Sequence, residues 1–138
     1  MSVTARLFAI ALSGACALVT VAPGRAAAQT PAPMPAGDAA AGEQVFRRLC
    51  TACHIPTAEG PRRLGPPLFG IVGRHSGTIR GFTYSQANRN ADVTWTPEVL
   101  YEYLRNPRAF IVGTTMSFAG IRDDQERANV VAYLQTLR

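Results

Sequence analysis

The sequence predicts an all-α domain of short helices joined by long loops, and three observations support this prediction. Apolar residues recur at helical spacing near residues 38–50, 96–105 and 123–137. Glycine and proline interrupt residues 55–81 too often for a long helix. No segment has the polar–apolar alternation of a convincing strand, and no internal repeat is present.

The first 28 residues form a predicted export signal that lies outside this domain. Arg6 precedes an apolar run over residues 7–22, and Ala26-Ala27-Ala28 offers small residues for cleavage before Gln29. The run of about 16 residues is short for a membrane span, which needs roughly 20, although an uncleaved anchor remains an alternative. We therefore expect a periplasmic protein, cleaved near Ala28 and without a membrane span afterwards.

The mature chain is expected to contain a leader and one domain. Residues 29–37 hold three prolines and no apolar face, which predicts a flexible leader. The domain then spans residues 38–138. Without the arginines of the signal, 12 basic residues face 9 acidic ones, a formal charge of +3. No basic run accompanies this modest charge, so nucleic-acid binding is not expected.

Two helical segments are expected in the first part of the domain. The first runs from about Asp38, a favourable N-cap, to Cys50. Its apolar side consists of Gly42, Val45, Phe46 and Leu49. A short helical turn is expected over residues 85–90.

Two further helices are expected in the last third of the chain. One starts at Thr96, has Pro97 at its first position and stops before Pro107. The other begins at Asp123, which forms a capping pattern with Glu126. Its expected buried stripe consists of Val130, Tyr133, Leu134 and Leu137.

Such a chain has a thin hydrophobic core. Long irregular loops are uncommon in a domain this small unless something fills its centre. Besides a few tyrosines, the bulky residues are Phe46, Phe69, Phe82, Trp95, Phe110 and Phe118. A large apolar cofactor would add the buried surface that the chain lacks.

The pentapeptide Cys50-Thr51-Ala52-Cys53-His54 is the attachment signature of c-type haem. Cysteines three residues apart on a helical turn can both form thioethers with one edge of a porphyrin, and the histidine that follows can bind the iron. A zinc site needs four good ligands, whereas the mature chain offers only these two cysteines, His54 and His75, and His54 follows Cys53 directly. A redox dithiol needs a βαβ setting, which is absent. A disulfide between Cys50 and Cys53 is the remaining alternative.

The sixth iron position requires a second ligand. The mature chain offers Met34 in the leader, Met116 in a glycine-containing loop, and His75. A thioether is a soft ligand that favours ferrous iron. Met34 lies between prolines in the leader, so Met116 is the preferred candidate. For Met116 the alternative is a core methionine, and His75 is expected to be an exposed loop histidine.

From about Asp38 to Arg138 the chain resembles the class I cytochromes c, which implies their all-α fold around one covalently bound haem c. Cys50, Cys53 and His54 match the attachment site and the proximal ligand of this family. The segment 65–70, Gly-Pro-Pro-Leu-Phe-Gly, is similar to the family's proximal loop. The resemblance implies that the Pro66 carbonyl accepts a hydrogen bond from the proximal histidine.

The resemblance also implies contacts to the haem propionates. Arg74 lies in a segment that looks like the family's arginine loop, and Tyr84, Asn88 and Trp95 match further donors. A propionate inside a small protein must be paired and hydrogen-bonded, because an unpaired buried charge costs several kcal/mol. The alternatives are that Tyr84 and Trp95 are core aromatics and that Asn88 is a surface helix residue.

The region around Met116 resembles the family's methionine loop. Tyr103 matches the tyrosine that contacts the axial sulfur, and residues 106–116 match the loop itself, with Thr114 among its cofactor-binding residues. Gly42 and Phe46 match the positions of the first helix that pack against Val130 and Tyr133 of the last. The chain departs from the family's lysine-rich loops at Arg108, Ala109 and Thr115, and it has Val112 where many members have proline.

These features predict a monomeric, periplasmic single-haem electron carrier of a respiratory chain rather than an enzyme. Expected donors are a cytochrome bc complex or a periplasmic dehydrogenase, and expected acceptors are a terminal oxidase or reductase. Alternatives are a dedicated cytochrome subunit of an oxidoreductase and a haem protein that binds gases or turns over peroxide. The candidate docking charges are Arg47, Arg48, Arg62, Arg63 and Arg108.

Overall fold

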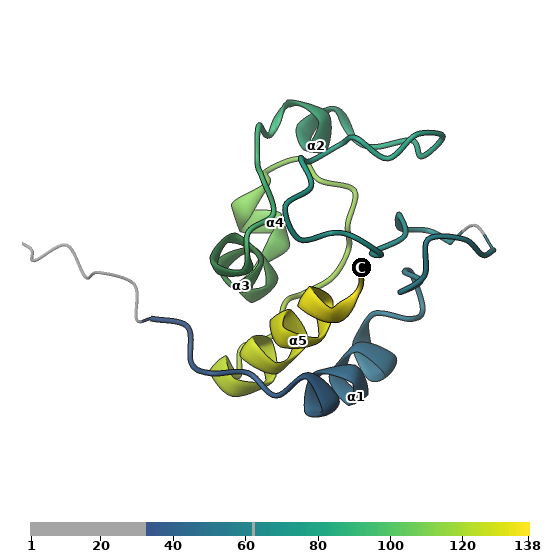
Figure 1. Cartoon of the computed structure of the whole chain (residues 1–138). Coiled ribbons are helices and arrows are strands. Elements are labelled where there is room, and N and C mark those ends of the chain that lie inside the picture. The colour runs from purple at the N-terminus through teal and green to yellow at the C-terminus, as the bar shows by residue number, and fades with distance from the viewer. Residues whose placement is uncertain (1–32, 62) are drawn as a thin grey trace, which may run out of the picture. The chain divides into compact units, whose positions relative to one another are not determined.

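The computed structural model describes residues 33–61 and 63–138, and these residues form five α-helices (Figure 1). The helices are α1 (Ala39–Leu49), α2 (Gln86–Asn90), α3 (Pro97–Arg105), α4 (Pro107–Phe110) and α5 (Asp124–Thr136). Within the described ranges β pairing is limited to one isolated antiparallel bridge between His75 and Thr94. The all-α prediction is therefore confirmed. The expected signal, the leader up to residue 32 and Arg62 lie outside the described residues.

Each expected helix begins directly after the residue at which the sequence indicated its start, and that residue is its N-cap. The Asp38 carboxylate accepts hydrogen bonds from the backbone N–H groups of Ala40 and Ala41. Ser85, Thr96 and Asp123 cap α2, α3 and α5 in the same manner. These side chains satisfy backbone donors that the first turn of a helix leaves unpaired.

Helix α4 was not expected from the sequence. Asn106 ends α3 and also caps α4, since its side-chain oxygen accepts a hydrogen bond from the Ala109 N–H at 3.2 Å. Pro107 then occupies the first position of the new helix, where its missing N–H costs nothing. The proline that stops one helix therefore starts the next.

Helices α1 and α5 pack closely against each other (Figure 1). A Cβ atom on Gly42 would lie 1.9 Å from the carbonyl oxygen of Asn129 and 3.0 Å from the Cβ of Tyr133. The ring centroids of Phe46 and Tyr133 lie 5.2 Å apart. The expected close approach is thus present, although Asn129 rather than Val130 stands opposite Gly42.

The buried face of α5 is wider than expected. Val130 and Leu134 are buried as predicted, whereas Tyr133 and Leu137 are only partly buried. Arg127, Ala128 and Val131 are also buried, which the predicted stripe did not include. Helix α5 packs against both α1 and α3, so more than one side of it faces protein.

Two of the expected core aromatics lie at the surface. Phe46 and Trp95 are buried, and Phe82 and Phe118 are partly buried. Phe69 and Phe110 are 39% and 41% exposed, so the prediction was wrong for these two residues. Phe69 stands in a turn and Phe110 at the end of the four-residue helix α4, where neither can turn fully inward.

The described end of the leader packs on α5. The Ala36 carbonyl accepts a hydrogen bond from the Gln125 side chain at 2.8 Å, and the Asp38 N–H donates to the Asn129 side chain at 2.9 Å. A Cβ atom on Gly37 would lie 2.3 Å from the Ala128 carbonyl oxygen. Residues 34–38 therefore belong to the packed domain, in contrast to the flexible leader expected for this part of the chain.

The long loop between α1 and α2 is held by backbone hydrogen bonds to distant segments. The Trp95 N–H donates to the Arg74 carbonyl at 2.9 Å, and the Ser76 N–H donates to the Val93 carbonyl at 2.7 Å. The Gly70 N–H donates to the Leu137 carbonyl at the end of the chain at 2.6 Å. These bonds fix the residues that line the centre of the domain.

Candidate functional site

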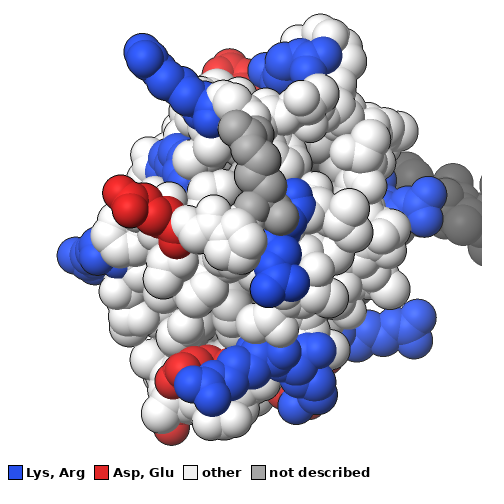
Figure 2. All heavy atoms as spheres, turned by 90° about the vertical axis from the view of Figure 1, so that its right-hand side faces the viewer, with Lys and Arg blue, Asp and Glu red and all other residues white. Residues whose placement is uncertain are grey.

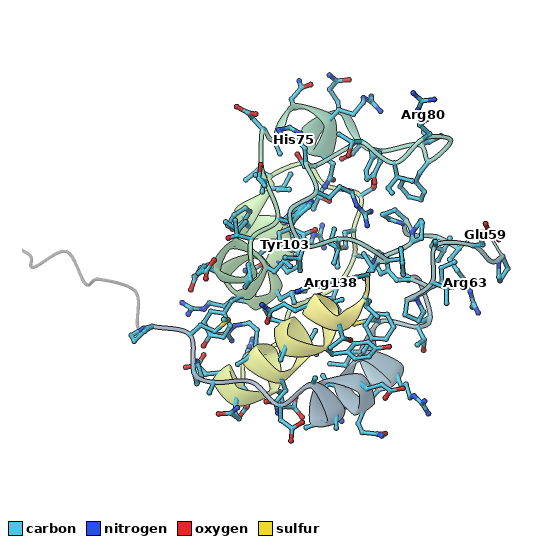
Figure 3. The ribbon with its side chains drawn as sticks, viewed as in Figure 1. Glu59, Arg63, His75, Arg80, Tyr103 and Arg138 are labelled. Atoms are coloured by element: carbon cyan, nitrogen blue, oxygen red, sulfur yellow. The ribbon has the colours of Figure 1, made fainter. Side chains whose placement is uncertain are left out.

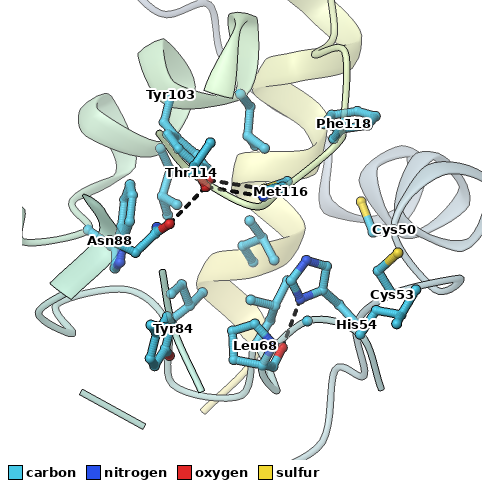
Figure 4. A pocket seen from close by; sticks show the side chains of 18 of the residues that line it. Cys50, Cys53, His54, Leu68, Tyr84, Asn88, Tyr103, Thr114, Met116 and Phe118 are labelled. Atoms are coloured by element: carbon cyan, nitrogen blue, oxygen red, sulfur yellow. Dashed lines mark hydrogen bonds between the residues drawn. The ribbon is translucent and has the colours of Figure 1, made fainter. Parts of the chain in front are cut away.

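A cavity of about 360 Å³ occupies the centre of the domain (Figure 4). Its walls come from α1, α2, α3 and α5 and from the loops between the helices. Every predicted cofactor-binding residue lines this cavity: Cys50, Cys53, His54, Pro66, Arg74, Tyr84, Asn88, Trp95, Tyr103, Thr114 and Met116. The structure thus brings together residues that lie up to 66 positions apart in the sequence.

Cys50 and Cys53 follow α1 directly and lie on one helical turn. The Cys53 N–H donates to the Cys50 carbonyl at 3.0 Å, and the His54 N–H donates to the same carbonyl at 2.8 Å. Both cysteines are free thiols, not joined in the alternative disulfide. Burial, and secondarily the neighbouring Cys53, raises the pKa of Cys50 to about 11, so this thiol stays protonated at neutral pH.

The His54 imidazole presents one free nitrogen to the cavity. Its Nδ1 lies 2.8 Å from the Pro66 carbonyl oxygen, which can only accept, so Nδ1 carries the proton. Burial lowers the pKa of His54, and the bond to Pro66 opposes this shift. The neutral ring therefore has its Nε2 lone pair available as a metal ligand.

Gly65 is a site residue whose role the sequence did not reveal. A Cβ atom at this position would lie 2.3 Å from Cε1 and 2.7 Å from Nε2 of His54. The imidazole lies directly over the Gly65 backbone, so any side chain there would displace the ring. In the sequence, the glycine directly before Pro66 was the one feature that could have indicated this role.

The Met116 sulfur lies across the cavity from His54 (Figure 4). The Tyr103 hydroxyl donates to the Met116 sulfur at 3.0 Å, and the Met116 N–H donates to the Thr114 hydroxyl oxygen at 3.2 Å. Burial raises the pKa of Tyr103 to about 12, so its hydroxyl remains a donor at neutral pH. Met34 packs on the hydrophobic core and does not line the cavity.

Asn88 connects helix α2 to the segment that carries Met116. Its side-chain oxygen accepts hydrogen bonds from the Thr114 hydroxyl at 2.7 Å and the Ser85 hydroxyl at 2.8 Å. The side chain is partly buried, which does not fit the alternative of a plain surface residue. The Asn88 side chain also hydrogen-bonds Tyr103, the residue that contacts the Met116 sulfur.

Arg74 turns its guanidinium toward the backbone of the proximal loop. It donates to the carbonyls of Pro67 at 3.1 Å, Gly70 at 3.3 Å and Phe69, and it hydrogen-bonds Tyr84. Burial raises the pKa of Tyr84, so the phenol is neutral and can donate. Arg74 and Tyr84 thus place a charge and a hydroxyl donor together on the cavity wall.

Trp95 and His75 lie on two neighbouring segments and both line the cavity, but they differ in exposure. Trp95 is buried, and its ring centroid lies 4.7 Å from that of Tyr103. The His75 side chain is 45% exposed, and its Nε2 lies 3.0 Å from the Asp92 carboxylate. His75 is the exposed loop histidine that the sequence indicated.

Arginines dominate one face of the domain (Figure 2). Arg63 points outward there near Glu59, and Arg80 points outward from a separate loop on the same side (Figure 3). Among the described residues no ion pair joins Arg63, Arg80 or Arg108 to an acid. Of the other candidate docking charges, Arg47 pairs with Glu43 at 2.6 Å and Arg48 with Glu126 at 2.7 Å.

The cavity residues fit a covalently attached haem. The donors are two thiols on one turn, an imidazole nitrogen and a thioether, which is the donor set of a c-type haem with histidine and methionine ligands. Many of the walls are core side chains: Phe46, Ile71, Leu100, Leu104, Val130 and Leu134. Within the described part of the chain, no three His, Cys, Asp or Glu side chains gather as a separate metal site.

The volume of the cavity also agrees with a bound cofactor. At roughly 24 cal/mol per Å³, a void of about 360 Å³ would cost up to roughly 9 kcal/mol. The cost is comparable to the whole stability of a small domain, about 5–15 kcal/mol. A large apolar group that fills this space would remove most of this cost.

Comparison with known proteins agrees with this assignment. Residues 39–138 match the family model described as cytochrome c. The chain is 51% identical to cytochrome c2 of Blastochloris viridis over 104 residues, which is 75% of this chain and 81% of that protein. It is 48% identical to cytochrome c of Chlamydomonas reinhardtii over 101 residues, 73% of this chain and 90% of that protein. For cytochrome c of Trypanosoma brucei brucei, the identity is 50% over 107 residues, 78% of this chain and 99% of that protein.

The match covers both the helices and the cavity residues, and it includes the Cys50-x-x-Cys53-His54 attachment spacing. The chain therefore belongs to the cytochrome c family, single-haem electron carriers that bind haem c covalently and act with redox partners rather than as enzymes.

Proposed function

We propose that this chain is a periplasmic electron carrier in which His54 and Met116 would be the two protein ligands that hold the haem iron. The observation that carries the proposal is their placement on opposite sides of one apolar cavity whose edge holds Cys50 and Cys53. Haem iron supplies one-electron chemistry by changing between its ferric and ferrous states. The chain supplies the donors and the surroundings that keep them in place.

Both proposed ligands are held by a second residue. The Pro66 carbonyl orients the His54 ring, and the Tyr103 hydroxyl bonds the Met116 sulfur. Because each bond restrains its side chain, the same two donors can serve both oxidation states with little rearrangement. Small rearrangement is the property that a fast electron carrier requires.

The ligand assignment is tested by changing each methionine of the mature chain. Met116→Ala should remove the weak charge-transfer band of sulfur-bound ferric haem at the edge of the near infrared and should permit CO to bind the ferrous form. Met34→Ala is the matched control, because Met34 packs on the core outside the cavity. Loss of the band in Met34→Ala alone would refute the assignment.

The polar side chains of the cavity wall are the proposed binding site of the haem carboxylates. Arg74 and Tyr84 are hydrogen-bonded to each other and line the cavity with Trp95 and Asn88. Arg74 supplies a positive charge, and Tyr84 supplies a donor that stays protonated. Such a set lowers the cost of enclosing carboxylates inside a small domain.

Export to the periplasm is inferred from the first 28 residues. The apolar run over residues 7–22 and the small residues Ala26–Ala28 favour cleavage near Ala28. None of the helices in the described part of the chain has the length and apolar character needed to cross a bilayer. N-terminal sequencing of the protein purified from its native host should find Gln29 as the first residue.

Docking to acidic redox proteins is proposed for the face that carries Arg63 and Arg80, with Arg108 as a further rim charge. The expected partners are a cytochrome bc complex or a dehydrogenase on the donor side and a terminal oxidase or reductase on the acceptor side. Arg47 and Arg48 contribute less, because each is neutralised by a glutamate of this chain. Such transient contacts rely on charge for a fast encounter.

The docking proposal predicts a rate that falls with salt. The Debye length shrinks from about 30 Å at 0.01 M to about 8 Å at 0.15 M salt, which screens exposed charges. Arg63→Glu should slow the second-order electron-transfer rate with an acidic partner protein, and Arg108→Glu should do the same. Arg122→Glu is the matched control, since Arg122 precedes α5, whose first turn lies far from the arginine-rich face (Figures 1 and 3).

A dedicated subunit of an oxidoreductase is the second candidate function. The observation that favours it is Leu64, which lines the cavity and is nevertheless 85% exposed. An exposed leucine at this position suits a lasting apolar contact better than a brief charged one. A rate independent of salt, with Arg63→Glu unchanged and Leu64→Ser slowed, would establish this candidate over the free carrier.

A further inference from the structure

Arg127, in the first turns of α5, has a fully buried side chain, with 0% of its surface exposed. It lies outside the cavity lining, so it plays no part in the site described above. A buried guanidinium is costly unless it is paired and hydrogen-bonded, and an apolar residue of similar size would often fill such a position equally well. The bonds that Arg127 makes indicate what it does.

The guanidinium bonds two consecutive backbone carbonyls. Its Nη1 donates to the Ile121 carbonyl at 2.7 Å and to the Arg122 carbonyl at 3.2 Å. Its Nη2 bonds the Asp124 carboxylate, and the carbon at its centre lies 4.1 Å from the Tyr101 ring centroid. Only Nε is left without a partner among the described residues. The guanidinium bonds the carbonyls with one nitrogen and the carboxylate with another, which the single nitrogen of lysine cannot reproduce.

Both carbonyls belong to the α4–α5 loop, residues 111–123, which carries Met116. The end of this loop is also fixed from the other side, because the Ile121 N–H donates to the Leu104 carbonyl of α3 at 2.8 Å. A Cβ atom on Gly120 would lie 2.1 Å from the Arg105 carbonyl oxygen, so the backbone passes α3 with no space to spare. Residues 120–122 are therefore clamped between α3 and Arg127.

The clamp lies only four residues after Met116. Before Met116, the loop is held by Thr114, whose hydroxyl bonds Asn88. With both sides fixed, the loop backbone can present the Met116 sulfur at one place in the cavity. If the later clamp is released, the loop gains freedom close to the sulfur without any change among the cavity residues.

We propose that Arg127 is a positioning residue that keeps the Met116 sulfur in the cavity by holding the end of the α4–α5 loop. The inference rests on the proposed ligation of the iron by Met116. Arg127 touches no proposed ligand and contributes through the Ile121 and Arg122 carbonyls alone. Its replacement weakens the hold on Met116 more than it weakens the domain as a whole.

Imidazole binding to the ferric holoprotein tests this role, because added imidazole must displace the Met116 sulfur. Arg127→Met removes the guanidinium, and Arg127→Lys keeps the charge but replaces two donor nitrogens at fixed positions by one. Val131→Ala is the matched control: Val131 is also 0% exposed and on α5, and it does not line the cavity. Denaturant unfolding of every variant measures the loss of global stability alongside.

Both Arg127 variants should bind imidazole about tenfold more tightly than the wild type or better, as expected for losing a buried hydrogen bond to a charged group. Val131→Ala should change imidazole affinity far less than an Arg127 variant that lowers the unfolding midpoint by the same amount. Amide hydrogen exchange should also rise at Ile121 but not at Trp95, whose N–H bonds the Arg74 carbonyl. If the Arg127→Met protein does not accumulate in the cell, the same measurements are made on Arg127→Lys.

Two outcomes separate this inference from the proposed function. If the wild type lacks the sulfur charge-transfer band, the Met116 ligation itself fails. If the band is present and is lost in Met116→Ala, but imidazole affinity in the Arg127 variants follows global stability as in Val131→Ala, the positioning role alone is refuted.

Discussion

The α1–α5 helix pair and the loops around the cavity are stabilised in different ways. In the helix pair, Gly42 lets the two backbones touch, and the Phe46 and Tyr133 rings fill the space beside it. In the loops, His54, Arg74, Thr114 and Met116 line a cavity of about 360 Å³, and His54 and Arg74 bond nearby backbone carbonyls. The helix pair is held by protein packed on protein, although Phe46, Val130 and Leu134 also line the cavity, whereas the loops depend far more on a group that the chain does not encode.

The comparison shows why the chain can be short. Few residues are needed for a core if a large cofactor fills its centre, and one helix pair can close the domain around it. Damage to the two regions should therefore have different signatures. In the loops it should appear first in the spectrum of the haem, and in the helix pair it should appear first in stability.

The largest effect is expected from removing the covalent attachment. In a Cys50→Ala/Cys53→Ala double variant, the haem should be extractable with acid-acetone, whereas the native protein should retain it through denaturation. The variant should also accumulate poorly, because the unfilled cavity would cost up to roughly 9 kcal/mol. Quantitative haem extraction from the native protein would contradict the thioether assignment.

An intermediate effect is expected from Gly42→Val, which breaks the helix pair. The new side chain begins 1.9 Å from the Asn129 carbonyl oxygen, so α1 and α5 must move apart. We expect a loss of about 3 kcal/mol in the free energy of unfolding, measured with denaturant on the ferric holoprotein. The absorption spectrum below the transition should remain native, since Met116 and its bonding partners lie on other elements.

Gln44→Val controls for the low helix propensity of valine at an exposed position of α1. Its cost should stay below about 1 kcal/mol. Equal losses in the two variants would mean that close packing at Gly42 contributes little.

The smallest effect is expected from His75→Gln, at the exposed edge of the loop region. The Asp92 carboxylate raises the pKa of His75 above its ordinary value of 6.5 by accepting a hydrogen bond from it. Because the pKa of His75 is higher in the folded chain than in the unfolded chain, its protonation stabilises the fold. This contribution is complete below pH 6.5 and is lost as the pH rises through the pKa of His75 in the folded chain. Wild type should therefore exceed the variant in Tm at about pH 5 but not at about pH 8.

The difference in Tm should be only about 1–2 °C, because the pair is exposed to solvent. It should also disappear at high salt, where surface charges are screened. A difference that grows with pH would have the opposite sign and would exclude the Asp92 pair as its cause.

Much of the helical structure was predictable because it depends on local chemistry. Asp38, Ser85, Thr96 and Asp123 each cap the helix that the sequence indicated, since capping needs only a few neighbouring residues. Helix α4 was missed because Pro107 ends one helix and starts another, and the sequence pattern indicates only the first of these roles. The cavity residues were found through the attachment motif and the family resemblance.

The unpredicted features depend on contacts between distant segments. Arg127 is buried because the Ile121 and Arg122 carbonyls turn toward it, and no periodicity in α5 indicates where those carbonyls lie. The need for Gly65 arises from the position of the His54 ring above it. Phe69 looked like a core residue by composition, but its turn leaves it 39% exposed.

The two ends of the packed domain differ as places to attach something else. Residues 36 and 38 are bonded to α5 through Gln125 and Asn129, so this end of the chain is held on α5 and not on the cavity loops. At the other end, the Leu137 carbonyl accepts a hydrogen bond from Gly70, in the turn that Arg74 also holds. A fusion partner or an electrode linker placed before Met34 leaves the haem surroundings untouched, whereas one joined to Arg138 pulls directly on the proximal loop.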